Sequence, residues 1–391
     1  MAARTLKALR DYGIDEHRGF LPAADPLDRL PPYFGPWEDA ARDIGARLMT
    51  GRMREAVAAL PELSPEGLTT DAERERAMLL LVCLANAHVW AADPPTSNVP
   101  AVLARPLHRL AAELDRPPII AHASIVLANW RRLDPARPLG MDNIDTQVTF
   151  LGGVDEKWFY LATAGVELTG APALKLLADG QEAVAGDDAA RLTSCLTDLR
   201  LVLDRTIRAF LDVERWCDPY VFYHRVRRFL TGWDGVTLDG TGAAPCVLAG
   251  GSAAQSSLIQ AFDTGLGIVH DDPLTAGFLG GMRRSMPKAH RRFLHDLGAG
   301  PSIRDYAGTA GHPPLTESYN AAVRTLTDLR GRHIGLTGRY ITRFERGEGK
   351  GTGGSDFVSM LRRAREETGG AAVQDTTSAS RPTWPVSEDQ Q

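Results

Sequence analysis

The sequence has little cysteine, and none of it is closely spaced. The four cysteines, Cys83, Cys195, Cys217 and Cys246, are scattered through the 391 residues without a CxxC pair. Thiolate zinc sites need clustered cysteines, and disulfide frameworks need a regular set of them. The sequence therefore predicts neither kind of site and favours a reducing compartment.

Features of membrane, secreted and nucleic-acid-binding proteins are also missing. No apolar run reaches the roughly 20 residues that a membrane-spanning helix needs, and the N-terminus lacks the apolar core of a secretory signal. The 44 basic and 49 acidic residues are interleaved and give a net charge of −5, without the basic face that nucleic acids attract. With 43% hydrophobic residues, we expect a globular cytoplasmic protein that binds neither membrane nor nucleic acid.

Several common catalytic motifs fail on inspection. The stretch GEGKGT at 347–352 has Gly351 where a phosphate loop needs Ser or Thr. The stretch GGSAA at 250–254 lacks the last glycine of a nucleophile elbow. There is no HExxH pattern and no histidine pair at i, i+4. These absences argue against an NTPase, an α/β-hydrolase and a zinc peptidase.

Helical periodicity dominates what is present. Apolar residues recur at steps of three and four, whereas the alternating pattern of strands is nearly absent. The predicted fold class is therefore all-α. The predicted helical ranges are about 38–60, 71–92, 100–114, 119–131, 158–180, 187–216, 252–269, 275–297 and 315–344.

Breaks in this pattern suggest a division of the chain. The stretches LDPARPLGMDN and LGGVDE interrupt the helices between 133 and 155. We predict a small N-terminal helical domain over 1–150 and a large helical domain over 151–370. The polar segment 371–391, which contains Pro and Ser, is predicted to be a disordered tail.

One histidine stands in an apolar helical stripe. Between Tyr319 and Phe344, apolar residues recur at helical spacing, and His333 takes one of these positions. Arg330 lies one turn earlier. The residues alone leave two interpretations open: a hydrogen-bonded core histidine, or a single axial ligand to haem iron with an arginine near a propionate.

A run of small residues precedes another predicted helix. The stretch 248–257 surrounds Ser252, which has capping-box spacing to Gln255. Helix initiation explains that pair, but the small residues also let the backbone approach another helix or a flat macrocycle. Downstream, Asp263 lies at the edge of an apolar face, where a carboxylate needs a partner; Arg330 is a candidate.

Two further segments place polar groups beside apolar faces. Asp218 and Pro219 are typical of a helix start, and the spacing that follows turns Arg227 toward an apolar stripe. Its guanidinium could pair with a structural carboxylate, which the spacing favours, or with a substrate carboxylate. Phe159 and Thr163, at i, i+4, share one helix face, an arrangement typical of core packing.

Short motifs follow one another in order along the chain. They are YGIDEHRGFLP at 12–22, DPL at 25–27, Trp37, VLANW at 126–130 with DP at 134–135, GGSAAQSS at 250–257 with FD at 262–263, MR at 282–283, MP at 286–287, HR at 290–291, Arg330 with His333, and GTGGSD at 351–356. As an ordered set, they resemble the indoleamine 2,3-dioxygenase family over nearly the whole chain.

The resemblance implies an all-helical fold in which a small N-terminal domain caps a large haem domain. It also implies haem b as cofactor, O2 as co-substrate, and opening of the indole 2,3-bond of L-tryptophan to give N-formylkynurenine. By this resemblance His333 is the proximal iron ligand, and Arg330 lies near a haem propionate with Asp263 as its acidic partner. Gly251 and Ala253 are implied to contact the cofactor from a wall of small residues.

The same resemblance implies roles on the distal side of the haem. Thr163 and Ser252 carry the hydroxyl groups implied to act in catalysis there. An external electron donor is implied as a partner that keeps the iron ferrous, and a monomer is favoured. The implied substrate-binding residues are Phe159, Phe222, Arg227 and Thr352.

Three departures from the family pattern leave the substrate open. Thr163 adds a methyl group where serine is usual, and His122 and Ile125 stand where some members have Tyr and Cys. The connection from Tyr340 to Gly351 is short. Alternatives are therefore a family oxygenase acting on a modified indole in specialised metabolism, one that inserts a single oxygen atom, or a haem-binding paralogue without turnover.

Overall fold

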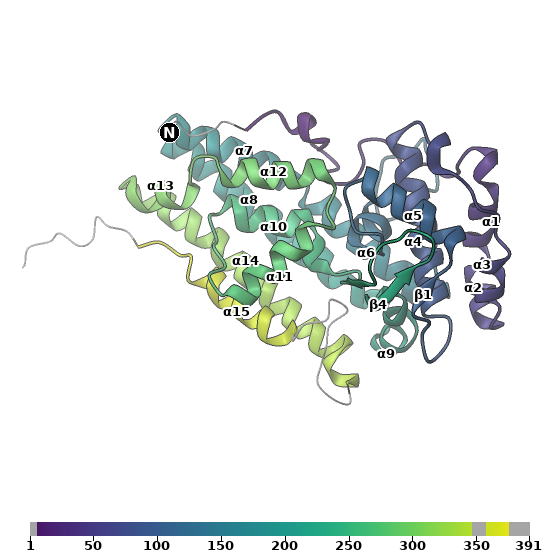
Figure 1. The fold of residues 1–391 in the computed structure, drawn as a ribbon. Helices are drawn as coiled ribbons and strands as arrows, with labels where there is room; N and C mark the ends of the chain where they lie inside the picture. Colours follow the sequence, from purple (N-terminus) through teal and green to yellow (C-terminus); the bar gives the residue numbers. More distant parts are fainter. Residues whose placement is uncertain (1–5, 346–356, 375–391) are drawn as a thin grey trace, which may run out of the picture.

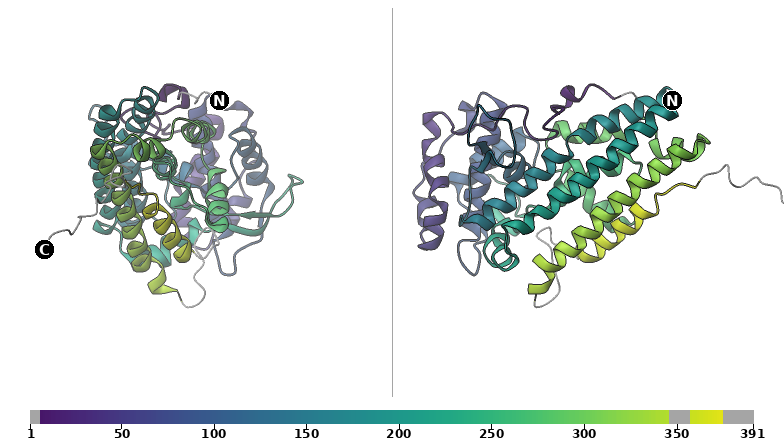
Figure 2. Two further views of the ribbon diagram at one scale, coloured as in Figure 1. Left: turned by 90° about the vertical axis from the view of Figure 1, so that its left-hand side faces the viewer. Right: turned by 180° about the vertical axis from the view of Figure 1, so that it is seen from behind.

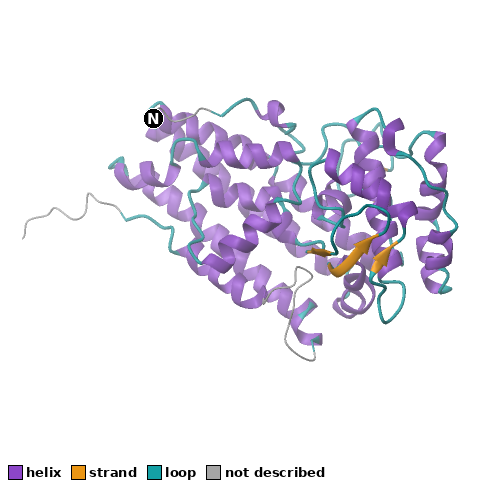
Figure 3. Ribbon diagram, in the orientation of Figure 1, coloured by secondary structure: helices purple, strands orange, loops and turns teal. Residues whose placement is uncertain are grey.

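The computed structural model describes residues 6–345 and 357–374. Helices make up most of these residues, with a few short strands at one side (Figure 3). The predicted all-α class is confirmed. No helix in this part of the chain is both long and apolar enough to cross a membrane.

The N-terminal third forms five α-helices, of which four pack around α4 (Figure 1). α4 begins with a capping box, because the Thr70 hydroxyl accepts from the Glu73 amide and the Glu73 carboxylate accepts from the Thr70 amide. Its mostly apolar sequence suits a helix buried on nearly all sides. The helices are α1 Gly35–Arg42, α2 Ile44–Met49, α3 Met53–Ala58, α4 Asp71–Val89 and α5 Ala101–Glu113.

The rest of the chain contains the longest helices. α8 packs against α6, α7 and α14, and α15 packs along α14; the view from behind in Figure 2 shows these rods running roughly side by side. The helices are α6 Val154–Gly170, α7 Pro172–Ala185, α8 Ala189–Leu211, α9 Pro219–Val221, α10 Ser257–Gly265, α11 Pro273–Arg283, α12 Lys288–Gly298, α13 Ile303–Thr309, α14 Pro313–Tyr340 and α15 Phe357–Gly369.

Short strands tie distant segments together. β1 pairs in parallel with β4, which pairs antiparallel with β5, and β2 and β3 form a separate antiparallel pair. The strands are β1 Asn98–Val99, β2 Trp130–Arg132, β3 Ile144–Thr146, β4 Trp233–Leu238 and β5 Cys246–Leu248.

Several predicted helices have different bounds in the structure. Pro172 begins α7, and Pro287 immediately precedes α12. The predicted ranges 158–180 and 275–297 are therefore each divided in two. The predicted helix 119–131 is wrong: it contains one π-helical turn, Ala123–Leu127, and then β2. The Asn129 side chain explains why the helical turn ends before β2, because it exchanges two hydrogen bonds with the Val148 backbone.

Two hydrophobic clusters form the core. The first is built mainly from residues 21–150, completed by residues 213–238, and the second joins residues 9–20 to helices of the C-terminal part. α6 passes from one to the other, with Tyr160 in the first cluster and Val166 in the second. The division into domains at residue 150 stays a prediction.

The start of the predicted tail packs onto α14. Ala371 is buried, and the Val373 backbone exchanges two hydrogen bonds of 2.9 Å with the Asn320 side chain. The remainder of the predicted tail, 375–391, lies outside the described residues.

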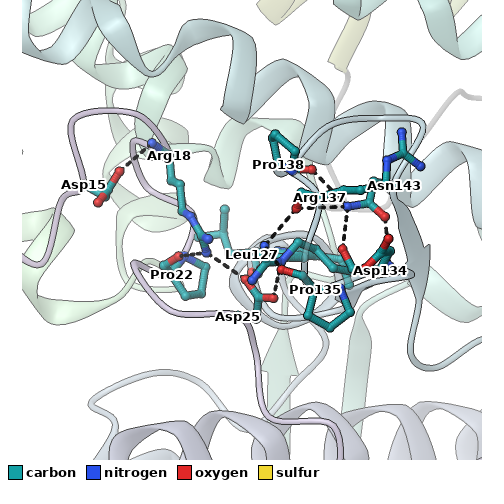
Figure 4. A network of polar contacts seen from close by, with 12 residues as sticks. Asp15, Arg18, Pro22, Asp25, Leu127, Asp134, Pro135, Arg137, Pro138 and Asn143 are labelled. Carbon is teal, nitrogen blue, oxygen red and sulfur yellow. Dashed lines mark hydrogen bonds and ion pairs between the residues drawn. The ribbon is translucent and has the colours of Figure 1, made fainter.

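A polar network joins the N-terminal arm to the segment where a domain boundary is predicted (Figure 4). Asp25 accepts from Arg18 at 3.0 Å and from Arg132 at 2.5 Å. The fully buried Asn143 side chain bonds the Asp134 amide and three carbonyls within the loop between β2 and β3. The loop is thus folded on itself and held to residues 15–25.

Candidate active site

α14 places His333 within its buried stripe, between Leu329 and Tyr340. The imidazole is half-buried and meets the Phe210 ring of α8 edge-on, with ring centroids 5.4 Å apart. Desolvation, aided by the Arg330 cation, lowers the pKa of His333 to about 4. Four preceding residues of the stripe are buried: Tyr319, Val323, Leu326 and Leu329.

The His333 imidazole is therefore available as a metal ligand. With a pKa near 4 the ring is neutral at pH 7, so it carries a nitrogen lone pair. Across residues 6–345 and 357–374, no protein group hydrogen-bonds to that ring, unlike a satisfied core histidine. No three His, Cys, Asp or Glu side chains gather into a metal site in the same residues. A single imidazole suits a metal whose other ligands come from a macrocycle.

The predicted partner of Arg330 is in place. Arg330 Nη2 lies 2.5 Å from Asp263 Oδ1, and both side chains are more than nine-tenths buried. Burial favours the neutral carboxyl, but Arg330 and His270 outweigh it and hold the pKa of Asp263 below its ordinary value. Arg330 Nε is buried and has no hydrogen-bond partner among the described residues. This guanidinium therefore retains a donor for an anion.

The predicted wall of small residues lies against the end of the 219–230 segment. The Gly251 amide donates to the Leu230 carbonyl at 3.0 Å. A Cβ on Gly250 would fall 2.1 Å from that same oxygen, and a Cβ on Gly251 would lie 3.3 Å from Ile125. Ser252 is half-buried and Ala253 exposed. Gly250 is required because backbone meets backbone there, whereas Gly251 faces the Ile125 side chain.

The Gln255 side chain fixes this wall by hydrogen bonds. Its Nε2 donates to the Gly250 carbonyl at 2.9 Å, while its Oε1 accepts from the amides of Ser252 and His122. The predicted capping box of Ser252 and Gln255 is confirmed. The same glutamine also joins the wall to the segment that contains Ile125.

Replacing Gly250 by alanine is expected to destabilise the protein by about 1–3 kcal/mol or more, because the added methyl overlaps backbone that cannot move freely. The measurement is the denaturant concentration at half-unfolding. Gly280→Ala is the matched control, since a Cβ there meets nothing within 4 Å. Equal midpoints for Gly250→Ala and the unaltered protein would contradict the close approach.

Aromatic side chains from three elements meet one another. The rings of Phe159 in α6 and Phe222 lie 4.5 Å apart, and Phe222 lies 5.8 Å from Tyr340 of α14. Tyr340 follows His333 by two helical turns, so both lie on one side of α14. Thr163 Oγ1 donates to the Phe159 carbonyl at 2.7 Å. The structure thus brings the predicted aromatic residues together.

Arg227 lies in a segment that departs from the predicted regular helix. After α9 come a π-helical turn, Phe222–Val226, and a 3₁₀ turn, Arg227–Leu230. Such turns alter the side-chain spacing and are frequent at functional sites. The Arg227 guanidinium is 16% exposed, lies over the Tyr223 ring and pairs with Glu345 at 3.5 Å. The favoured carboxylate partner is therefore present.

One predicted residue cannot be placed, and one buried group was missed. Thr352 lies outside the described residues. Glu167, only 1% exposed, accepts from the Ser256 hydroxyl at 2.6 Å and lies 2.9 Å from His122 Nε2. These contacts fix the start of α10 beside the wall. A glutamate within the apolar stretch LATAGVEL of α6 was the available signal.

Comparison with known proteins identifies relatives of this chain. The family model for indoleamine 2,3-dioxygenase matches residues 8–371. The chain is 35% identical to indoleamine 2,3-dioxygenase 2 of Mus musculus, over 92% of this chain and 94% of the relative. It is 34% identical to indoleamine 2,3-dioxygenase 1 of Rattus norvegicus over 97% of each, and 32% identical to indoleamine 2,3-dioxygenase of Saccharomyces cerevisiae over 86% and 81%.

Proposed function

The chain belongs to the indoleamine 2,3-dioxygenase family, and from this premise we propose that it adds both atoms of O2 across the indole C2–C3 bond of L-tryptophan, giving N-formylkynurenine. Members of the family are haem-dependent oxidoreductases. The observation that carries the proposal for this chain is His333: a neutral, half-buried imidazole to which none of the described protein groups is bonded.

The residues present fit haem b. His333 would hold the iron, and Arg330, with its buried Nε lacking a partner in the described part of the chain, would bind a propionate. Gly251 and Ala253 would contact the macrocycle where larger side chains would exclude it. Haem, when bound, would supply the iron that activates O2. Asp263 would keep the Arg330 guanidinium in place.

Arg227 would orient the substrate by its carboxylate. A guanidinium forms two parallel hydrogen bonds with a carboxylate, which sets direction as well as distance. Phe159 and Phe222, already in contact, would flank the indole ring and exclude water. Thr352 would contact the substrate ammonium or a propionate. The C2–C3 bond would then be held at one place in the pocket.

Neither proposed catalytic hydroxyl is arranged as a strong base. The Thr163 hydroxyl donates a hydrogen bond to the Phe159 carbonyl, which leaves the lone pairs of its oxygen to accept one. Ser252 Oγ accepts from the Ala254 amide and retains its own proton to donate. These groups would orient the substrate and oxygen by hydrogen bonding. An electron-rich indole ring does not need a strong base for its oxidation.

Glu345→Gln is expected to lower KM for L-tryptophan about two- to fivefold, the range typical of a partly exposed ion pair. The Glu345 carboxylate is paired with the Arg227 guanidinium, which the substrate carboxylate would use. Steady-state kinetics of the haem-loaded protein is the measurement. Glu214→Gln, which breaks the ion pair of Glu214 with Arg339 of α14, is the control. A raised KM would mean that Glu345 positions Arg227 instead.

The function is tested by spectroscopy and product analysis. Purified protein with added hemin, reduced and then given O2 and L-tryptophan, should consume the amino acid and form a product heavier by two oxygen atoms. Heavy-isotope O2 should label both atoms. Addition of one atom would support a monooxygenase, turnover of modified indoles alone would support specialised metabolism, and haem binding without consumption would support a non-catalytic paralogue. Failure of the purified protein to bind hemin would refute all of these.

Three further properties stay predictions. The external electron donor, the monomeric state and the cytoplasmic location follow from the family and from composition.

A further inference from the structure

His270 lies between two carboxylates beneath the proposed haem-binding arginine. It lies in the loop between α10 and α11, and its side chain is 8% exposed. Its Nε2 lies 3.3 Å from Asp263 Oδ2, and its Nδ1 lies 2.6 Å from Glu367 Oε2 of α15. Asp263 uses its other oxygen for Arg330. Arg330, Asp263, His270 and Glu367 thus form a continuous chain of contacts from α14 through α10 to α15.

This geometry favours a doubly protonated ring. An ionised carboxylate only accepts hydrogen bonds, and a neutral imidazole has one N–H to donate. Two carboxylates can therefore both be satisfied only by the imidazolium. Burial disfavours that charged form, but Asp263 and Glu367 outweigh burial and the Arg330 cation, so the pKa of His270 is raised. The four groups then balance as two cations and two anions.

The loop that contains His270, between α10 and α11, contacts α15 at two further points. Glu367 Oε1 accepts from the Asp272 amide at 3.1 Å, and Arg363 of α15 forms an ion pair with the Asp272 carboxylate. α15 also packs along α14 and α11. Within residues 6–345 and 357–374, the charged groups around His270 and its partners are Asp263, Glu367, Arg330, the Arg363–Asp272 pair, and Arg283 of α11, whose cation also acts on Asp263.

We propose that His270 is a positioning residue that, as an imidazolium, clamps α15 to α10 and fixes the Asp263 carboxylate under Arg330, so that this guanidinium is held ready for a carboxylate anion. The anion is a haem propionate if the proposed function holds, and on this point the proposal rests on it. The clamp itself is a property of the protein alone.

The sign of the pH effect follows from the contacts. A group whose pKa is raised on folding adds stability below its unfolded value, near 6.5, and this stability is lost as pH rises through the higher folded value. Loss of the proton leaves a nitrogen lone pair facing a carboxylate. We therefore expect the attachment of α15, and the affinity of Arg330 for an anion, to weaken above neutral pH.

The test begins with the apoprotein. Hydrogen exchange of the α15 amides, expressed as protection relative to the intrinsic rate, should fall about tenfold between about pH 6 and about pH 9. His270→Gln and Glu367→Gln should each show low protection throughout. His108→Gln, at an exposed position of α5, should behave as the unaltered protein. NMR titration of the His270 ring in the unaltered protein checks its protonation without any variant.

The second part measures hemin binding. The unaltered protein should lose affinity severalfold over the same pH range, and His270→Gln should abolish that dependence. Unchanged α15 protection in both clamp variants, or a His270 ring that is neutral at pH 7, would overturn the proposal. If the exchange results hold but the unaltered protein does not bind hemin, the proposed function fails and the clamp stands. If hemin binds but α15 is unaffected, the clamp alone is wrong.

Discussion

Replacing His333 by alanine is expected to abolish stable haem binding while leaving the apoprotein folded. The imidazole would be the only protein ligand to the iron, so its loss should weaken hemin affinity well beyond the roughly 10- to 100-fold that losing an outer partner of a ligand costs. Folding should persist, because within the described residues the ring makes no hydrogen bond that alanine would remove. Hemin titration and apoprotein unfolding measure the two effects.

A second variant separates ligation from packing. His333→Gly leaves room beside Phe210 for free imidazole, which should restore the spectrum of a histidine-bound haem. His108→Ala, on the surface of α5, should bind hemin as the unaltered protein does. A His333→Ala protein that keeps the spectrum of five-coordinate, histidine-bound haem would refute the assignment of the ligand.

Replacing Arg227 by alanine is expected to raise KM for L-tryptophan by about 10- to 150-fold. This range corresponds to the roughly 1.5–3 kcal/mol of a hydrogen bond to a charged group. If the contact is equally strong in the ground state and the transition state, kcat should change little. Arg227→Lys should recover only part of the affinity, because an ammonium cannot form two parallel bonds to a carboxylate. Steady-state kinetics over a range of substrate concentrations gives both constants.

The control for this prediction lies two residues away. Arg225 is exposed, so Arg225→Ala removes the same charge without touching the proposed substrate-binding residues and should leave KM near its original value. Indole derivatives without the carboxylate should be insensitive to Arg227→Ala. An unchanged KM for L-tryptophan would mean that Arg227 serves only its ion pair with Glu345.

Local signals in the sequence predicted much of the helical architecture and one key contact. The stripe from Tyr319 placed His333 on α14 with the correct facing, and the spacing of Ser252 and Gln255 predicted a real capping box. The pairing of Asp263 with Arg330 was also anticipated, because a carboxylate at an apolar edge needs a cation. These features depend on neighbours within a few turns or on simple charge balance.

Features set by distant partners could not be predicted. Helical periodicity at 119–131 did not predict β2, because this strand forms by pairing with β3, which lies beyond a long loop. The π-helical turn before Arg227 has no sequence signature in a single chain. His270 and Glu367 are ordinary surface-type residues until α15 folds back along α14 and brings them together.

The pairing of β1 with β4 constrains how the nascent chain folds. Asn98 and Val99 leave the ribosome long before their partners Thr237 and Leu238, and residues 213–238 complete the cluster that surrounds α4. The apolar surface of α4 that residues 213–238 cover therefore stays exposed while the long α6, α7 and α8 are translated. We expect the growing polypeptide to be most prone to aggregation, and most dependent on chaperones, during that interval.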